Sequence, residues 1–84
     1  MNVIIIEDEL RTAQRLKSIL EKINPDIHVL EILASVESAV NWINQHDAPD
    51  LMFADIQLGD GLSFDIFRQV NKNIPVIFCT AFDE

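Results

Sequence analysis

The sequence predicts an α/β fold in which a parallel sheet carries helices on both of its faces. Two observations lead to this prediction. Short apolar segments rich in β-branched or bulky residues recur along the chain, and they alternate with segments whose apolar residues step by three and four. The resulting order, βαβαβαβ, is typical of parallel strands joined by right-handed helical crossovers. We therefore expect one sheet between two helical layers.

The predicted strands are short runs bounded by acids, Pro or Thr. Residues 3–6, 51–54 and 76–79 are uninterrupted apolar runs, which indicates strands buried on both faces. Residues 27–34 form a less pure candidate, because polar residues such as Glu31 interrupt the pattern. An outer strand tolerates such interruptions, so we expect this segment at one edge of the sheet.

The predicted helices lie between these runs. Residues 10–23 have an apolar stripe with basic residues elsewhere, and an Asn-Pro pair follows them, which predicts an amphipathic helix that ends there. Residues 36–43 indicate a second helix, with Ser35 as its N-cap. A third helix is expected at 64–70, after a glycine-containing loop and with Ser63 as its cap.

Composition excludes several classes of function. The chain of 84 residues has 14 acids against 6 Lys or Arg and a net charge of -8, which disfavours direct contact with nucleic acid. The single Cys79 excludes an internal disulfide framework and suits a reducing compartment. No apolar run is long enough for a signal sequence or a membrane span. We expect one small cytoplasmic domain without membrane contact.

Acidic and hydroxyl side chains follow three of the predicted strands. Glu7 and Asp8 come after the first strand, Asp55 after the third and Thr80 after the fourth. In parallel sheets of this class, ligands bind beyond the carboxyl ends of the strands, where these residues meet. Crowded carboxylates repel one another unless a cation neutralises them, and Mg²⁺ prefers oxygen ligands. The pattern predicts a Mg²⁺ site at which Asp55 can attack a phosphoryl group.

Each of these residues also has a simpler interpretation. Glu7 and Asp8 can be solvated acids at a helix N-terminus, and Asp55 can stabilise a turn. The coincidence of several such features at strand ends favours the functional interpretation. Asp60 is interpreted as a loop acid, because its neighbours lack the acid spacing of a calcium loop. Cys79 is interpreted as a core thiol of the fourth strand.

The combined pattern resembles the receiver domain of two-component response regulators, over the whole segment from residue 3 to 84. The resemblance implies a flavodoxin-like sheet with strand order 2-1-3-4-5. It also implies that Glu7 and Asp8 help to hold Mg²⁺, that the Gln57 backbone carbonyl completes the metal shell with Asp55, and that Asp55 accepts a phosphoryl group from a histidine kinase.

The same resemblance assigns roles near the end of the chain. Thr80 matches the switch hydroxyl of receivers, and the Ala81 backbone amide would face the phosphoryl group. The sequence of residues 55–58 and 80–84 is similar to that of regulators whose receiver precedes a LytTR-type DNA-binding domain. The expected function is therefore a relay from a histidine kinase to an output domain or partner that regulates transcription.

A complete receiver would continue beyond residue 84 through a further helix, a fifth strand that ends in a phosphate-binding Lys, and a final helix. We therefore expect residues 1–84 to be a receiver-like phosphoacceptor domain that is incomplete at its C-terminus, with an open sheet edge at 76–79 through which two copies can pair. The domain is not expected to be a turnover enzyme. The alternative is a receiver-fold interaction module that never carries phosphate; a phosphohydrolase is disfavoured because Gln57 stands where a second acid is needed.

Overall fold

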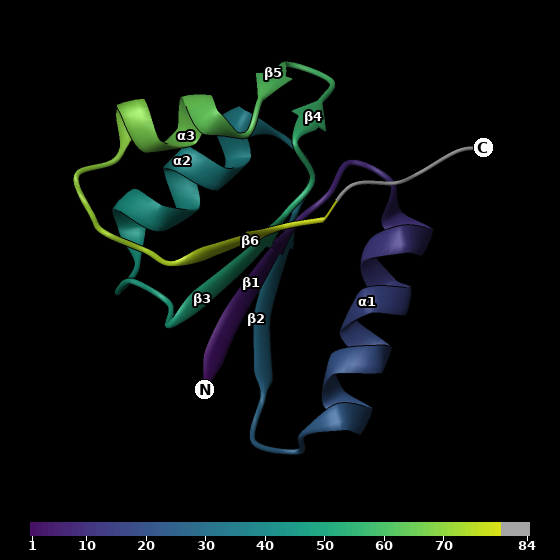
Figure 1. The fold of residues 1–84 in the computed structure, drawn as a ribbon. Coiled ribbons are helices and arrows are strands. Elements are labelled where there is room, and N and C mark those ends of the chain that lie inside the picture. Colours follow the sequence, from purple (N-terminus) through teal and green to yellow (C-terminus); the bar gives the residue numbers. More distant parts are fainter. Residues whose placement is uncertain (80–84) are drawn as a thin grey trace.

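The computed structural model describes residues 1–79 and shows a parallel sheet with helices on both faces (Figure 1). The strands of this sheet are β1 (Asn2–Ile6), β2 (His28–Leu33), β3 (Leu51–Ala54) and β6 (Val76–Phe78). The helices are α1 (Leu10–Ile23), α2 (Val36–Gln45) and α3 (Phe64–Gln69). The strand order is β2-β1-β3-β6, and every neighbouring pair is parallel. The predicted fold class is confirmed, with β2 at an edge as expected.

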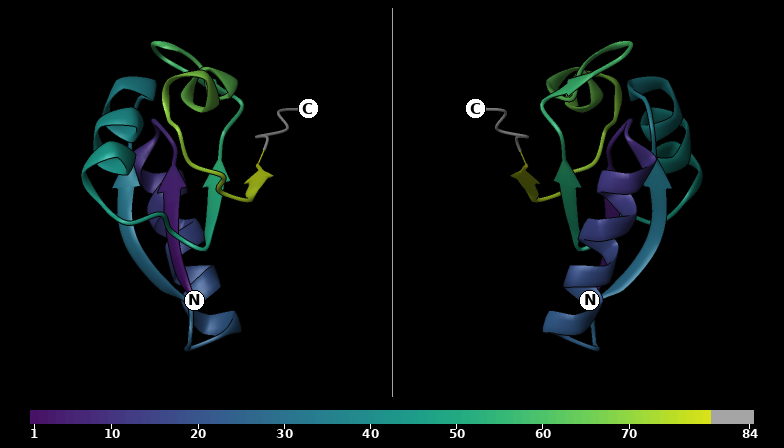
Figure 2. Two further views of the ribbon diagram at one scale, coloured as in Figure 1. Left: turned by 90° about the vertical axis from the view of Figure 1, so that its left-hand side faces the viewer. Right: turned by 90° about the vertical axis from the view of Figure 1, so that its right-hand side faces the viewer.

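The helices form two layers, with α1 on one face of the sheet and α2 and α3 on the other (Figure 2). Strand β1 is central, and its side chains contribute to the hydrophobic cores on both faces of the sheet. Ile4 and Ile6 are fully buried against the α2 and α3 side, whereas Ile5 is fully buried on the α1 side. Because successive side chains of a strand point to opposite faces, a strand covered on both sides must be apolar throughout.

Strand β6 does not have the two-sided burial that its apolar sequence predicted. Val76 and Phe78 pack against the α2 and α3 core, but Ile77, which points to the other face, remains 48% exposed. The strand also ends at Phe78, so Cys79 follows it and is only partly buried. The expectation of a core thiol inside the strand was therefore wrong, because the strand ends before Cys79 and α1 covers this position only in part.

Of the two predicted helix caps, the structure confirms one and corrects the other. Ser35 caps α2: its hydroxyl accepts the Ser38 N–H at 3.0 Å, and the Ser38 hydroxyl accepts the Ser35 N–H at 3.1 Å, which completes a capping box. Ser63 precedes α3 but makes no capping hydrogen bond. It is fully buried, and its hydroxyl donates to the Ile56 carbonyl at 3.3 Å.

None of the helices within residues 1–79 has both the length and the apolar character that crossing a bilayer requires.

The segment after Asp55, which was expected to be a loop, contains a small antiparallel hairpin. Its strands are β4 (Gln57–Leu58) and β5 (Gly61–Leu62), and the hairpin lies beside α3 (Figure 1). Gly61 has a φ of 145°, a conformation that other residues rarely adopt. A side chain at this position would also bring its Cβ to 3.1 Å from the Asp65 carboxylate. Glycine is thus required where the chain turns back toward α3.

Candidate metal centre at the carboxyl edge of the sheet

The site residues lie where the direction of the strand order reverses. From β1 the chain goes outward to β2 and then returns to β3 on the other side of β1. Ligand sites of doubly wound sheets occur beyond the carboxyl ends of the strands at such a point. Glu7 and Asp8 follow β1 directly, and Asp55 follows β3. The fold therefore brings residues that are 47 or 48 positions apart to one edge.

Three carboxylates converge at this edge. One oxygen from each of Glu7, Asp8 and Asp55 lies within 4.8 Å of the other two. Asp8 is exposed, whereas Glu7 and Asp55 are half-buried. The structure thus brings together the three acids that the sequence placed at the strand ends. Gln57 lies two residues after Asp55, in β4, and its role as a ligand remains a prediction. Thr80 and Ala81 fall outside the described residues, so the roles assigned to them also remain predictions.

Backbone hydrogen bonds hold the site residues in the register of the sheet. The Glu7 N–H donates to the Leu33 carbonyl at 2.9 Å, and the Asp55 N–H donates to the Ile6 carbonyl at 2.9 Å. The Cys79 N–H donates to the last carbonyl of β3 at 2.8 Å. Each strand ladder therefore continues one residue past its strand. By the two-residue alternation, these three side chains point to the face that α1 covers.

A hollow of about 100 Å³ lies between the sheet and α1 at this edge. It is lined by Glu7, Asp55 and Cys79 from the strand ends and by Thr12, Ala13 and Leu16 from α1. The walls are mainly apolar, so a carboxylate placed here is partly removed from water.

Glu7 responds most strongly to this environment. Burial in the hollow raises the pKa of its carboxyl from 4.5 to about 7, and the charges of Asp55 and Asp8 act in the same direction. The hydrogen bond that Glu7 accepts from the Glu9 N–H at 3.1 Å acts in the opposite direction but does not compensate. A metal-free site therefore retains a proton near neutral pH that an isolated Glu would have lost.

Cys79 is the neighbour that sequence analysis did not assign to the site. It lines the hollow beside the acids, and burial, followed by the charges of Asp55 and Glu7, raises the pKa of its thiol. A thiol whose pKa is raised is a poor nucleophile, so this environment does not favour catalysis by Cys79. Its position could have been found from the alternation along 76–79 only if the end of β6 had been known.

The donor set fits a hard divalent cation. Carboxylate oxygens are the ligands that Mg²⁺ prefers, and it is commonly held by one or two of them with waters in its remaining positions. The exposed Asp8 leaves room for such waters, and a cation would relieve the repulsion that contributes to the raised pKa of Glu7. Lys72 does not contribute a positive charge to this site, because its ammonium donates to the carbonyls of Ile43 and His46 at the C-terminal end of α2.

Comparison with curated proteins gives relatives over the full chain. The chain is 32% identical over 87 aligned residues to the sensory transduction protein LytT of Bacillus cereus, and the match covers 100% of this chain and 35% of LytT. It is 35% identical over 85 residues to the phyllosphere-induced regulator PhyR of Methylorubrum extorquens, with 98% of this chain and 31% of PhyR covered. The chain thus spans about a third of the length of these relatives.

Two solved structures share the fold of this chain. PhyR of Bartonella quintana, in complex with the anti-sigma factor NepR, superposes with a TM-score of 0.82 at 38% identity, over 99% of this chain and 35% of PhyR. The response regulator MaeR bound to beryllium trifluoride superposes with a TM-score of 0.83 at 25% identity, over 100% of this chain and 70% of MaeR.

The family model for the response regulator receiver domain matches residues 3–84, which is nearly the whole chain. This match agrees with the parallel sheet, with the acids at its carboxyl edge and with the relatives among sensory and regulatory proteins. It also supports the expectation of a signalling domain rather than a turnover enzyme. The chain belongs to the response regulator receiver domain family of two-component signalling.

Proposed function

We propose that this receiver accepts a phosphoryl group on Asp55 from a histidine kinase and thereby switches an output partner. The convergence of Glu7, Asp8 and Asp55 is the observation that carries the proposal. Asp55 is the acid that the β3 ladder positions at the reversal point of the strand order, at the mouth of the hollow. The other two acids follow the neighbouring strand β1 and lie close enough to Asp55 to share a cation with it.

In the proposed reaction, a carboxylate oxygen of Asp55 attacks the phosphorus of a phosphohistidine. The P–N bond breaks, the imidazole leaves and takes up a proton, and Asp55 becomes an acyl phosphate. Mg²⁺, when bound, neutralises charge on the phosphoryl oxygens. Glu7, Asp8 and Asp55 would hold the cation together with the Gln57 backbone carbonyl. Thr80 and Ala81 would contact the phosphoryl group through a hydroxyl and an amide.

The output of the relay is proposed from the relatives. LytT is a sensory transduction protein, and PhyR has been solved in complex with the anti-sigma factor NepR. We propose that residues 1–84 are the receiver part of a longer cytoplasmic regulator, whose output is a DNA-binding domain of the LytTR type or a protein partner. Phosphorylation would change the affinity of the receiver for that output.

Incubation with Mg²⁺ and a small phosphodonor tests the proposal. Intact-mass analysis should show one added phosphoryl group, and peptide mapping should place it on Asp55. The Asp55→Asn variant should take up none, whereas Asp47→Asn, which makes the same change at an exposed position before β3, should behave as the unmodified chain. A folded chain that takes up no phosphate would support the non-phosphorylated interaction module. Release of many phosphates per chain would indicate a phosphohydrolase.

A further inference from the structure

Asp60, at the tip of the β4–β5 hairpin, is hydrogen-bonded to the beginning of α2. Its carboxylate accepts the Val36 N–H at 2.8 Å and the Glu37 N–H at 3.1 Å. These are the first two residues of α2, whose N–H groups have no partner within the helix. The two hydrogen bonds hold the pKa of Asp60 below its usual range, which indicates that the ionised carboxylate is the form that binds. Ser35 caps the same helix through a different N–H group, so Asp60 adds a tertiary contact to a helix that is already capped.

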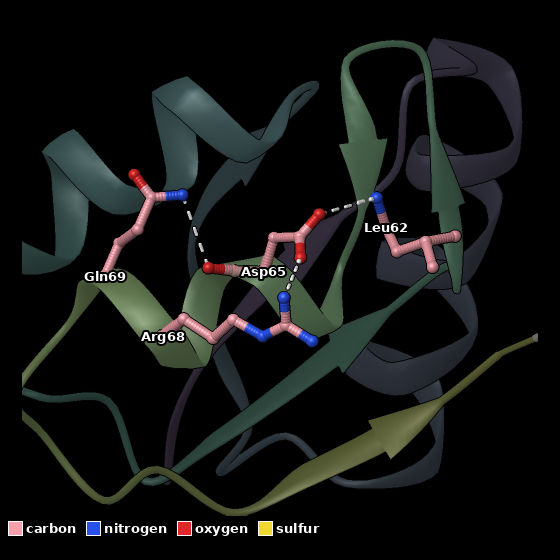
Figure 3. Close-up of polar contacts among 4 residues, drawn as sticks. All are labelled: Leu62, Asp65, Arg68 and Gln69. Atoms are coloured by element: carbon pink, nitrogen blue, oxygen red, sulfur yellow. Dashed lines mark hydrogen bonds and ion pairs between the residues drawn. The ribbon is translucent and has the colours of Figure 1, made fainter.

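The second strand of the hairpin, β5, is held by α3 (Figure 3). The Asp65 carboxylate accepts the Leu62 N–H at 3.3 Å and pairs with Arg68 at 3.4 Å, while the Gln69 side-chain amide donates to the Asp65 carbonyl. The hairpin is therefore held between two helices, by Asp60 toward α2 and by Asp65 toward α3.

The base of the hairpin adjoins the candidate metal centre. The Ser63 N–H donates to the Ile56 carbonyl at 2.8 Å, which closes the hairpin one residue after Asp55. The hairpin has only two residue pairs, so Asp60 at its tip lies just three positions from Gln57 on one side and from Ser63 on the other. Leu58 is buried in the α2 and α3 core and provides a further anchor in the same element.

We propose that Asp60 is a positioning residue for the metal centre: by fixing the hairpin tip to the N-terminus of α2, it sets the direction in which residues 55–57 leave β3. The effect on the geometry of the hairpin follows from the hydrogen bonds alone. The effect on Mg²⁺ rests on the proposed function, in which Asp55 and the Gln57 carbonyl are ligands.

Two variants of Asp60 and one control separate positioning from charge. Asp60→Ala removes both acceptor oxygens, whereas Asp60→Asn removes the charge but retains one acceptor. Asp47→Ala removes one negative charge at an exposed position at the opposite end of α2. Two measurements are made on each chain: hydrogen exchange of the Ser63 amide without metal, and the Kd of Mg²⁺ by calorimetry.

Asp60→Ala should accelerate exchange of the Ser63 amide about fivefold, as expected for loss of a capping contact of ordinary strength, and should weaken Mg²⁺ binding by a similar factor. Asp60→Asn should lie between Asp60→Ala and the unmodified chain in both measurements, and it keeps the test open if Asp60→Ala does not fold. Asp47→Ala should leave both values unchanged.

Unchanged exchange of the Ser63 amide in Asp60→Ala would overturn the proposal. Accelerated exchange in Asp60→Ala together with an equal loss of Mg²⁺ affinity in both Asp60 variants would also overturn it, because the effect on the metal would then be one of charge alone. If the unmodified chain binds no Mg²⁺ while Asp60→Ala still accelerates exchange, Asp60 positions the hairpin as proposed and it is the proposed metal function that fails.

Discussion

Among single residues, Glu7 is expected to make stability depend on pH. Its pKa is raised from 4.5 to about 7 in the folded chain, by burial and then by the neighbouring acids. Between these values the folded chain holds a proton that the unfolded chain has lost, so the free energy of unfolding falls as pH rises through this window. Urea unfolding of the metal-free chain at about pH 5 and about pH 7 measures the effect.

The same experiment has an internal control. Glu7→Gln should flatten the dependence, because the variant cannot titrate at this position, and Mg²⁺ should reverse it by stabilising the ionised site. A metal-free stability that is constant or rises over this range in the unmodified chain would show that the carboxylates do not crowd one another as proposed.

Mg²⁺ affinity is the second property set by single residues. Asp55→Asn replaces a proposed ligand by a neutral amide and should weaken Mg²⁺ binding by about tenfold or more, since even the partners of metal ligands contribute that much. Titration calorimetry measures it, with Asp47→Asn as a charge-matched control. An unchanged Kd in Asp55→Asn would place the cation elsewhere.

The sequence could place the acids because they come at the ends of two apolar runs, and parallel strands end at one edge. It could not place Cys79, since its exposure depends on how far the α1 layer extends over the sheet. The role of Asp60 was also hidden, because its partners lie 24 and 23 residues earlier and no local pattern connects them.

For whole elements, the capping box of α2 is expected to be measurable. Ser35→Ala removes the hydroxyl that accepts the Ser38 N–H and should lower the free energy of unfolding by about 1 kcal/mol. Urea unfolding provides the value. Ser18→Ala, at an exposed position inside α1, is the matched control and should have little effect. Equal stabilities of Ser35→Ala and the unmodified chain would mean that Asp60 alone is a sufficient cap.

The elements that the sequence predicted are those long enough to show a period. The fourteen-residue α1 and the apolar runs of β1 and β3 emerge from periodicity and composition. Strands β4 and β5, with two residues each, are too short to show any alternation. Ser63 satisfied the local rule for a cap but is buried, because its hydroxyl closes the base of the hairpin.

At the scale of the whole molecule, the two faces of the sheet are covered unequally. The order β2-β1-β3-β6 agrees with the order that the family resemblance implied. The α2 and α3 layer reaches from Ile4 to Phe78, whereas the α1 layer covers mainly β1 and β2. Local sequence patterns report that a segment is apolar but not which of its faces finds a partner. The exposed face of β6 is therefore a property that only the three-dimensional arrangement shows.

This unequal coverage leads to a prediction about self-association. Within residues 1–79, β6 pairs with β3 alone and exposes 48% of Ile77 on the face that α1 does not cover. An unpaired strand edge beside an exposed apolar face favours pairing with a second copy. We expect the 84-residue chain to associate as its concentration rises, and Ile77→Lys to weaken this association, as measured by sedimentation velocity.

Ile19→Lys is the matched control, because Ile19 is exposed to a similar degree, 44%, but lies on α1. Each substitution makes the net charge of -8 less negative and so reduces the repulsion between copies. A loss of association in Ile77→Lys alone therefore assigns the contact to the β6 edge and not to the change in net charge. A chain that stays monomeric at every concentration, or an equal effect of both substitutions, would show that this edge does not pair.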